Sequence, residues 1–529
     1  MSAISLADRL LPTRAVRQQK DKPKYKVPAV KEIRNDFEVW KRHCPLLYSN
    51  MIMQKIRTNN VLSSLQWLPS AKNAPSSTVS DNDRKDVKKI EFAGKDKHRQ
   101  EDGSCSTSNN NYTKSLKARK TTRATPTERL VVTASGVSCS EIKVYQVANI
   151  DGIAASVNLE QQLRCNGRIS KIRHMPQRPN ILAAQCDSSG AGTRIFKLKQ
   201  QQQAKDVSEI KKTKTRASIS EDCLEVALTY DEGLITGKEN SGWNNDSLSS
   251  HISSAYFPRP ALSWNQKREG ELLTSGSRGS VFMWDISELS RSVEPRRIFE
   301  SHQGEVTDIA WKSEWEFLTA GDDGYLRLWD KRDHRKDVPC ASIAIADGSR
   351  GCTCVRTCGS APNVVATAAE IADTSPHNRM QKEPMKKLQW HGNEVLDIAW
   401  LPTPPNMKTT TATKNILASA SSDRRVAVWD LSSLSSSAAT TATTQFGEGE
   451  DEDEGPPELL FVHGGHISSV TAVDWSYKDQ MLAASIECDG RLHIWRMATV
   501  LYDPNQIKAI KKRYQKFKKT SRSKKKHKA

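Results

Sequence analysis

Residues 321–332 read GDDGYLRLWDKR. The glycines and aspartates that open this stretch predict a tight turn. From Tyr325 to Trp329, polar and apolar side chains alternate. Such alternation puts the two kinds of side chain on opposite faces of a half-buried strand. The stretch therefore predicts a turn followed by a strand that closes on a tryptophan.

The same pattern recurs along the chain. Strands of this kind end at VFMWDI, LRLWDK, VAVWDL and LHIWRM, with Trp284, Trp329, Trp429 and Trp495. The first two tryptophans are 45 residues apart, which is the length of one four-stranded propeller blade. The interval from Trp329 to Trp429 fits two blades, the first of them degenerate, with expected strands at 353–355 and 364–367.

Further strand patterns occur upstream, at 129–136, 141–148, 169–198 and 224–238. Together these segments predict an all-β, seven-bladed β-propeller, in which ring closure removes exposed sheet edges. The expected organisation is a flexible basic N-terminus (1–27), a helix and entry to the propeller (28–69), a low-complexity insertion (70–125), the propeller (126–502) and a basic tail (503–529). Disordered insertions are expected at 199–222, 238–250, 371–386 and 434–455.

Two of the predicted blades carry residues suited to a buried hydrogen-bond relay. The expected sets are His302, Thr319, Asp323 and Trp329, and His391, Ser419, Asp423 and Trp429. A buried polar chain is stable only when every member is satisfied, so it would fix the blade's geometry. Because the set recurs from blade to blade, we interpret it as scaffold rather than as a catalytic triad. The blade that ends at Trp284 has Arg278 at the aspartate position and is expected to be looser.

The composition limits the class of protein. The 529 residues carry a formal net charge of +19 and are 36% hydrophobic, which favours polar insertions around a core. No run of 18 apolar residues occurs, so no membrane span is predicted. The N-terminus lacks the uninterrupted apolar stretch of a secretory signal. Eleven cysteines lack a framework spacing, so we expect reduced thiols. Cys352, Cys354 and Cys358 resemble half a zinc site but lack a second ligand pair, so neither metal nor cofactor is expected.

The positive charge is concentrated at the C-terminus, where residues 508–529 hold twelve lysines and arginines and no acid. Such a run predicts nuclear import and non-specific attraction to nucleic-acid phosphate, or only a solubility tail. The residues expected to form the import signal are Lys511, Lys512, Arg513, Lys524, Lys525 and Lys526. The predicted location is therefore the nucleus.

Residues 448–466, EGEDEDEGPPELLFVHGGH, place six acidic residues before two prolines and an apolar run. Charge of a single sign stays in solvent, and prolines stiffen the chain, so a projecting loop is expected. At the other end, Ile33, Phe37, Trp40 and Cys44 form an apolar stripe on a predicted helix that Pro45 ends. This stripe either docks onto the propeller side or borders a groove for a partner's helix.

At these residues the chain resembles the retinoblastoma-binding histone chaperones, a WD-repeat family that includes the small subunit of chromatin assembly factor. The similar text is EVWKRHCPLLYS (38–49), SLQWLP (64–69), RHMPQRPNILAA (173–184), SDRRVAVWDLSSL (422–434) and GPPELLFVHGGH (455–466). The resemblance implies a seven-bladed propeller with a helix on its side. It also implies a non-catalytic adaptor of chromatin assembly, remodelling or histone deacetylase complexes.

The resemblance further implies that the first helix of the fourth core histone binds between the N-terminal helix and the acidic loop. The implied groove residues are Phe37, Trp40, Lys41, Leu47, Asp453, Glu454, Pro456, Pro457, Leu460 and Phe461. A second site of the family, at the narrow top of the propeller, takes a basic tail such as that of the third histone. Of its acidic ring only Glu394 remains here, and Arg168, Ser170, Pro258, Pro260, Thr307 and Cys352 stand at the other positions. The chain is therefore expected to be a divergent member.

Two other roles stay open. A ribosome-biogenesis chaperone similar to the glutamate-rich WD-repeat family would use the same architecture for a basic ribosomal protein. Trp329 to Arg332 is similar to the Trp-Asp-x-Arg box of receptors for cullin ubiquitin ligases, although an ordinary blade end reads the same. An enzyme is the least favoured class, because no phosphate-binding glycine loop and no nucleophile with a base stand outside the relays.

Overall fold

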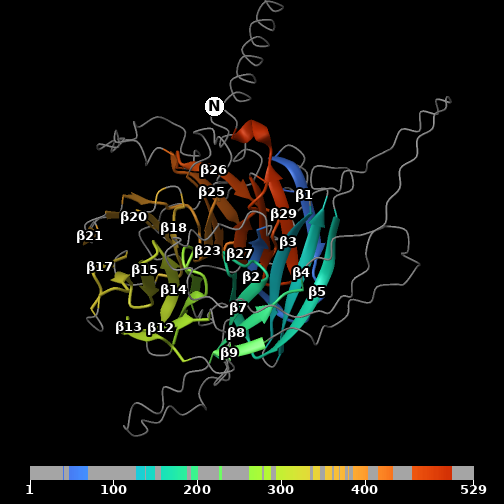
Figure 1. The fold of residues 1–529 in the computed structure, drawn as a ribbon. Helices are drawn as coiled ribbons and strands as arrows, with labels where there is room; N and C mark the ends of the chain where they lie inside the picture. The colour runs from blue at the N-terminus through green and yellow to red at the C-terminus, as the bar shows by residue number, and fades with distance from the viewer. Residues whose placement is uncertain are drawn as a thin grey trace, which may run out of the picture.

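The computed structural model shows an all-β protein built from small sheets of four or five strands (Figure 1). The residues that it describes are 40, 47–69, 127–136, 139–148, 156–186, 192–199, 225–228, 261–276, 279–286, 294–333, 338–345, 352–359, 361, 363–368, 370–375, 379–380, 385–402, 415–432, 456–479 and 481–502. The predicted all-β propeller class is confirmed.

The strands of the described residues form seven antiparallel sheets. The first comprises β2 (Val61–Leu68), β3 (Thr127–Ser135), β4 (Cys139–Ala148) and β5 (Ser156–Asn166). The second comprises β6 (Ile169–His174), β7 (Ile181–Cys186), β8 (Thr193–Lys197) and β9 (Glu225–Leu228). The third comprises β10 (Leu262–Trp264), β11 (Glu271–Ser275), β12 (Ser280–Asp285) and β13 (Arg297–Glu300). The fourth comprises β14 (Val306–Trp311), β15 (Glu316–Gly321), β16 (Tyr325–Asp330) and β17 (Ala341–Ala344).

The fifth sheet comprises β18 (Val355–Thr357), β19 (Val364–Thr367), β20 (Glu370–Ser375), β21 (Arg379–Met380) and β22 (Lys386–Lys387). The sixth comprises β23 (Val395–Trp400), β24 (Ile416–Ser421), β25 (Val426–Asp430) and β26 (Leu459–His463). The last comprises β27 (Val470–Trp475), β28 (Leu482–Glu487), β29 (Arg491–Met497) and, from the other end of the chain, β1 (Tyr48–Lys55). A short 3-10 turn, Thr499–Leu501, follows β29.

The first strand of each sheet lies innermost. The innermost strands contact one another in the order β2, β6, β10, β14, β18, β23, β27 and back to β2. The strand β1 pairs along its length with β29, from Tyr48 opposite Met497 to Lys55 opposite Arg491. Figure 1 shows this N-terminal strand in blue beside the red C-terminal one. Backbone hydrogen bonds between the two ends of the chain therefore complete the last sheet.

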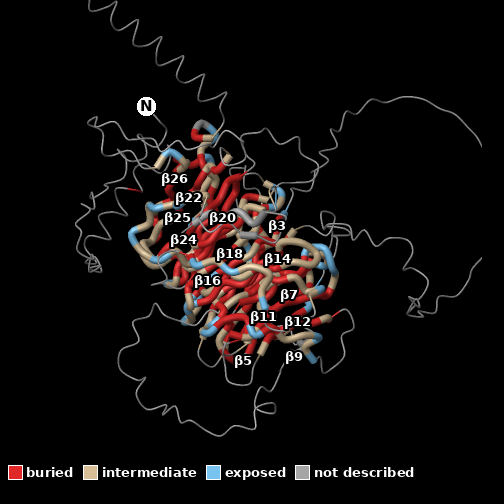
Figure 2. The backbone as a smooth tube through the Cα atoms, turned by 90° about the vertical axis from the view of Figure 1, so that its left-hand side faces the viewer, coloured by how far each residue is buried: buried red, intermediate tan, exposed pale blue. Residues whose placement is uncertain are grey.

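Apolar clusters fill the spaces between neighbouring sheets, and Figure 2 shows the buried positions running through the strands, with exposed ones mainly at the loops. The strand β24 has the sequence ILASAS and every one of its residues is buried. Small side chains suit it because sheets pack against both of its faces. Each closing tryptophan, such as Trp429 or Trp495, is also buried in one of these clusters. The repeated pattern thus provides both the strands and the packing between them.

The expected insertion at 371–386 is partly structured, because β20, β21 and the first residue of β22 lie in it. Polar composition concealed these strands, since they lie at the outer part of the fifth sheet, where one face can stay in water. Of the predicted N-terminal helix only Trp40 belongs to the described residues, so that helix stays a prediction. The other predicted insertions, the N-terminus and the basic tail beyond residue 502 lie mainly or wholly outside them. No helix among the described residues is long and apolar enough to cross a membrane.

Candidate functional site

Both predicted relays are present. His302 Nδ1 lies 2.8 Å from Asp323 Oδ1 and its Nε2 lies 2.8 Å from Thr319 Oγ1. Trp329 Nε1 donates to the same Thr319 hydroxyl at 3.0 Å. In the sixth sheet the corresponding distances are 2.9 Å from His391 to Asp423 and 2.8 Å from His391 to Ser419, and Trp429 donates to Ser419 at 2.9 Å.

The charges of the relay suit a structural role. Burial lowers the pKa of His302 and keeps the ring neutral. Burial alone would raise the pKa of Asp323, but hydrogen bonds from Arg327 and His302 outweigh it and lower that pKa. Each hydroxyl already accepts from an indole and bonds to an imidazole, which fits its use as a link. A nucleophile would need to be free to attack a substrate, and this hydroxyl is not.

The last sheet has a third relay that the sequence analysis missed. Trp495 Nε1 donates to Ser485 at 3.1 Å, and Ser485 lies 2.8 Å from His466 Nε2. The carboxylate beside His466 is Glu487, at 3.2 Å, rather than the turn residue Asp489. Burial raises the pKa of Glu487 and lowers the pKa of His466 to about 3. A pattern search does not find Glu487, because it lies two positions before Asp489, where the repeat predicts the carboxylate.

Two more histidines extend this relay towards the N-terminal segment. The ring of His493 stacks on His466 with centroids 3.8 Å apart, and His493 Nδ1 lies 3.2 Å from His463 Nε2. His463 Nδ1 is 2.8 Å from the hydroxyl of Tyr48, which in turn accepts from Trp40 Nε1 at 3.3 Å. Two hydrogen-bonded chains, joined by the stacking of His466 on His493, therefore connect the core of the last sheet with Trp40.

Trp40 is held by shape as well as by hydrogen bonding, and only 2% of it is exposed. A Cβ atom at Gly465, whose φ is +90°, would lie 2.5 Å from the Trp40 ring, and one at Gly464 would lie 2.8 Å from it. Only glycine permits so close an approach, and at Gly465 it also permits the left-handed backbone. The two glycines of the VHGGH sequence thus form the surface on which the Trp40 ring packs. We call Trp40, Tyr48, His463, Gly464 and Gly465 the joint.

The histidines of this region are near enough together to suggest a metal site. His463, His466 and His493 have ring nitrogens within 4.8 Å of one another. However, His466 and His493 are stacked at 3.8 Å with planes only 10° apart. A ligated metal lies close to the plane of each imidazole, and two stacked, nearly parallel planes cannot share such a point. This cluster consequently does not fit a metal in its present arrangement, and burial lowers the pKa values of all three rings, which keeps them neutral.

The three cysteines that resemble half a zinc site in the sequence have other surroundings in the structure. Cys352 Sγ donates to the carbonyl of Cys354, and Cys358 Sγ lies 3.6 Å from Asn415 Oδ1. Burial raises the pKa of Cys354 well above its usual range. A cysteine binds zinc as a thiolate, whereas this buried environment favours the neutral thiol.

The residues predicted for the histone groove divide into three groups. Trp40, Leu47 and Phe461 are only 1–2% exposed and belong to one apolar cluster, so they support the surface from beneath and do not line it. Pro457 is exposed, while Pro456 and Leu460 are partly buried. Phe37, Lys41, Asp453 and Glu454 lie outside the described residues.

Leu460 owes its position to a β-bulge in β26. Phe461 pairs with Val428 and Leu459 pairs with Trp429, so Leu460 is the extra residue between them. A bulge re-aims the extra side chain, and Leu460 packs as a partly buried residue against the cluster that contains Trp40. Just before it, Leu459 N donates to Pro456 O at 2.9 Å, which closes the Pro-Pro turn. The partly exposed apolar surface here consists of Pro456, Pro457 and Leu460.

Glu394, the acidic residue predicted at the propeller top, is exposed in the loop before β23. Its backbone carbonyl accepts from Ser422 N at 3.0 Å. Cys352, from the same expected ring, is buried, and its carbonyl accepts from Thr307. Pro258 and Pro260 lie outside the described residues.

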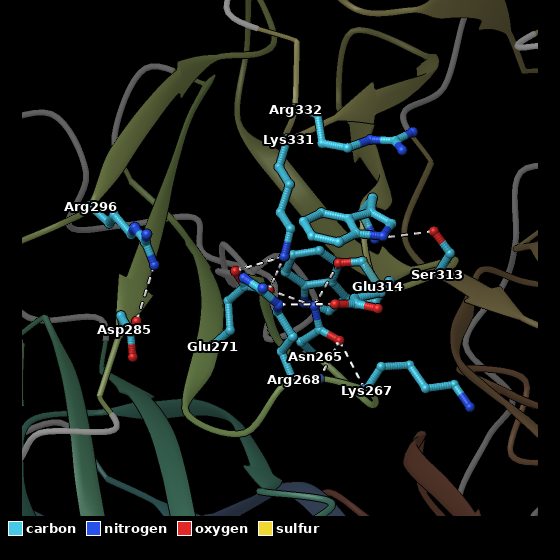
Figure 3. Close-up of polar contacts among 12 residues, drawn as sticks. Asn265, Lys267, Arg268, Glu271, Asp285, Arg296, Ser313, Glu314, Lys331 and Arg332 are labelled. Atoms are coloured by element: carbon cyan, nitrogen blue, oxygen red, sulfur yellow. Dashed lines mark hydrogen bonds and ion pairs between the residues drawn. The ribbon is translucent and has the colours of Figure 1, made fainter. Parts of the chain in front are cut away.

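The Trp-Asp-x-Arg segment has an exposed end and a buried one. Arg332 donates to both oxygens of Asp330, and 60% of its side chain is exposed. The neighbouring Lys331 points inward to Glu271 in a buried ion pair at 2.6 Å, as Figure 3 shows. Arg268, Lys331 and Arg332 all lie within 5.6 Å of the Trp315 ring centre. The segment therefore presents one arginine on a well-fixed surface.

Comparison with known proteins agrees with the repeat pattern. The family model described as "WD domain, G-beta repeat" matches residues 293–330, 382–430 and 457–496. The chain is 24% identical over 393 residues to the WD-40 repeat-containing protein MSI3 of Arabidopsis thaliana, which covers 66% of this chain and 70% of the relative. The predicted family resemblance is confirmed. The chain thus carries WD repeats and is similar, at low identity, to the WD-repeat protein MSI3.

Proposed function

We propose that the protein is a nuclear, non-catalytic adaptor of chromatin complexes that binds the first helix of the fourth core histone. The observation that carries the proposal is the joint, which ties the N-terminal segment to the C-terminal end of β26, the strand that follows the Pro-Pro turn. The similarity to MSI3 supports the WD-repeat scaffold class. We also infer that the seven sheets are the seven blades of one ring.

The joint supports the proposal because it fixes the geometry on both sides of the binding surface. Trp40 is the nearest described residue to the predicted helix stripe, and it is locked against Gly464 and Gly465. The acidic run 448–454 ends immediately before the turn at Pro456 and Pro457. Leu460 packs against the apolar cluster that contains Trp40, and this proximity is what supports a shared surface for the two segments.

Apolar and charged residues would contribute differently to binding. Burial of one apolar side chain of the histone helix contributes about 1.5–3 kcal/mol, while an exposed acid–arginine pair contributes only ~0–1 kcal/mol. Leu460 and the two prolines would therefore supply affinity, whereas Asp453 and Glu454 would orient and attract the basic helix. Trp40, Leu47 and Phe461 would hold the surface in place from below.

The acidic part of this proposal is tested by pulldown of the purified fourth histone. Asp453→Lys together with Glu454→Lys should lower recovery strongly, whereas Glu269→Lys together with Glu294→Lys changes the net charge equally and should leave it unaltered. Equal recovery by the wild type and the first variant would remove the acidic run from the site.

A second role is favoured by the exposure of Arg332. The guanidinium is preorganised by Asp330 and Trp315, which suits a contact with a cullin-ligase adaptor. Affinity purification of the Arg332→Ala protein should then lose that adaptor while retaining histones. Unchanged adaptor recovery would exclude this role.

A further inference from the structure

A cavity of about 480 Å³ opens where the innermost strands end. Every sheet contributes to its wall, including Gln66 of β2, Arg173 of β6, Trp264 of β10, Trp311 of β14, Arg356 of β18 and Asp474 of β27. It lies in the central channel, whereas the joint involves the outer strands β1 and β26. Its function can therefore be separated from that of the proposed histone surface.

The channel wall behind the cavity contains cations and carboxylates in a connected ion-pair network. Arg356 is paired with Asp308 and, at 3.1 Å, with Asp397, and Lys171 is paired with the same Asp308. Two cations thus share two carboxylates. Both aspartates come from repeated text, EVTDIAW at 305–311 and EVLDIAW at 394–400, which the sequence analysis overlooked.

Arg173 stands outside this network. Its guanidinium donates to the carbonyl of Ile172 at 2.8 Å, and no carboxylate of the described residues lies within ion-pair distance of it. The remaining carboxylate in the wall, Asp474, accepts from Trp67 N at 2.8 Å. Burial raises the pKa of Asp474 to about 7, so near neutral pH it balances Arg173 only in part. Arg173 is half-buried, and a partly desolvated guanidinium without a full counter-charge favours an incoming anion.

Neutral groups beside Arg173 can contribute further contacts. His174 also lines the cavity, is buried, and has no hydrogen-bond partner at Nδ1. Burial lowers the pKa of His174 to about 3, so the ring is neutral and can donate one hydrogen bond. At the cavity mouth Lys267 is exposed, and Figure 3 shows its side chain extending away from Glu271 and Glu314.

Tryptophan side chains contribute apolar surface to the wall. The indole nitrogens of Trp264, Trp311 and Trp400 donate to carbonyls of Arg173, Ser263 and Arg356 respectively, each on the neighbouring sheet's innermost strand. These bonds fix the indoles and use up their polar atoms. The ligand that fits such a wall has an apolar group next to its charge.

We propose that this cavity binds a carboxylate flanked by an apolar group, with Arg173 as its main partner and His174 and Lys267 as secondary donors. A carboxylate forms paired hydrogen bonds with a guanidinium. A monoanion matches one unbalanced cation, while a phosphate dianion would be repelled by Asp397 and Asp474 in the same wall. The source is either an acidic side chain of a partner peptide or a free carboxylic acid.

Ligand-observed NMR titration of the full chain tests the proposal with four probes: end-blocked Leu-Glu-Leu, end-blocked Leu-Gln-Leu, 4-methylpentanoate and inorganic phosphate. Leu-Glu-Leu should bind about tenfold or more tightly than Leu-Gln-Leu, because the charge-assisted bonds are lost in the amide. The compound 4-methylpentanoate is a monoanion with an apolar end, so its competition would indicate a free acid as the source, and its failure to compete would indicate a peptide. Equal binding of the two peptides, or tighter binding of phosphate, would overturn the proposal.

Variants assign the site. Arg173→Met should weaken Leu-Glu-Leu about tenfold, and Lys267→Met, at an exposed position, should weaken it a few-fold. Asp474→Asn removes a competing carboxylate with little change of shape and should strengthen binding. Arg296→Met is the control, since Arg296 is an exposed arginine paired with Asp285 in another part of the third sheet. If Lys267→Met and Asp474→Asn fold normally and neither alters binding, the cavity is not the site, even where Arg173→Met fails to fold.

Discussion

The relay of the fourth sheet and the relay of the last sheet start from the same parts but end differently. In the fourth sheet the chain from Trp329 through Thr319 and His302 stops at Asp323 in the adjacent turn. In the last sheet, His493 and His463 carry polar contacts outward from His466 to Tyr48 and Trp40. The first relay fixes one blade, whereas the second also attaches a segment from the other end of the chain.

The difference teaches how a repeated scaffold acquires a specific surface. Where the fourth sheet has Arg327, which contacts both His302 and Asp323, the last sheet has His493. An arginine closes the relay by pairing with its carboxylate. His493 instead stacks on His466 and hydrogen-bonds to His463, and so the outer edge of the last sheet becomes an attachment point.

The largest expected effect is the loss of the Trp40 side chain. Trp40→Ala would leave a cavity over Gly464 and Gly465, and the free energy of unfolding should fall by about 3–5 kcal/mol. Chemical denaturation measures the change. Trp315→Ala, at a half-buried tryptophan of the fourth sheet, should cost clearly less, and equal losses would mean that the joint has no special role.

The next largest effect is expected in the pH dependence of stability, through His466 of the last sheet's relay. His466 has a folded pKa of about 3, below its unfolded value, so the unfolded chain binds more protons and stability is lost as the pH falls below about 6.5. Between pH 6.5 and 5 this group alone should cost about 2 kcal/mol. His466→Gln should flatten the pH profile by that amount. A profile identical to the wild type would show that His466 is not held neutral.

A smaller effect is expected from neutralising the carboxylates of the relays. Hydrogen bonds from His391 overcome burial and lower the pKa of Asp423, whereas burial raises the pKa of Glu487. Asp423→Asn should therefore destabilise the protein by about 1–2 kcal/mol at pH 7. Glu487→Gln should cost less or nothing in the same denaturation experiment. The reverse order would contradict our account of the charges.

The smallest expected effect is that of Arg332→Ala. The Arg332 side chain is 60% exposed and contacts Asp330 and Trp315 from the solvent side, so the melting temperature should stay within error of the wild type. A clear decrease would show that the Trp-Asp-x-Arg segment supports the fold and would weaken its proposed use as a contact.

Repeating patterns could be predicted from the sequence, and contacts between distant segments could not. The strand alternation before Trp329 and the spacing of His302, Thr319 and Asp323 identified two relays correctly, because those residues are close in the chain. The Glu487 relay breaks the spacing rule. The contact of Trp40 with Gly465 joins residues more than 400 positions apart, so no local pattern predicts it. It becomes visible only in the structure, where β1 pairs with β29 and brings the two segments together.

The same limit explains the groove. An amphipathic stripe marks Trp40 as an inward-facing residue but does not distinguish docking from partner binding, and its 2% exposure favours docking. For Leu460 the sequence gives no sign of the bulge in β26 that re-aims it. The charged residues around Arg173 likewise come from separate sheets, and only the arrangement of those sheets around the channel brings them together.

We propose that the surface at the Pro-Pro turn, supported from beneath by Trp40, binds a basic histone helix through Leu460. The direct measurement is the dissociation constant of a peptide comprising the first helix of the fourth histone, titrated into wild type, Leu460→Arg and Val338→Arg. Val338 is an aliphatic residue that is 49% exposed on another sheet's edge loop, so both variants add the same charge. We predict about tenfold or more weakening for Leu460→Arg alone; equal dissociation constants for all three proteins would contradict the account.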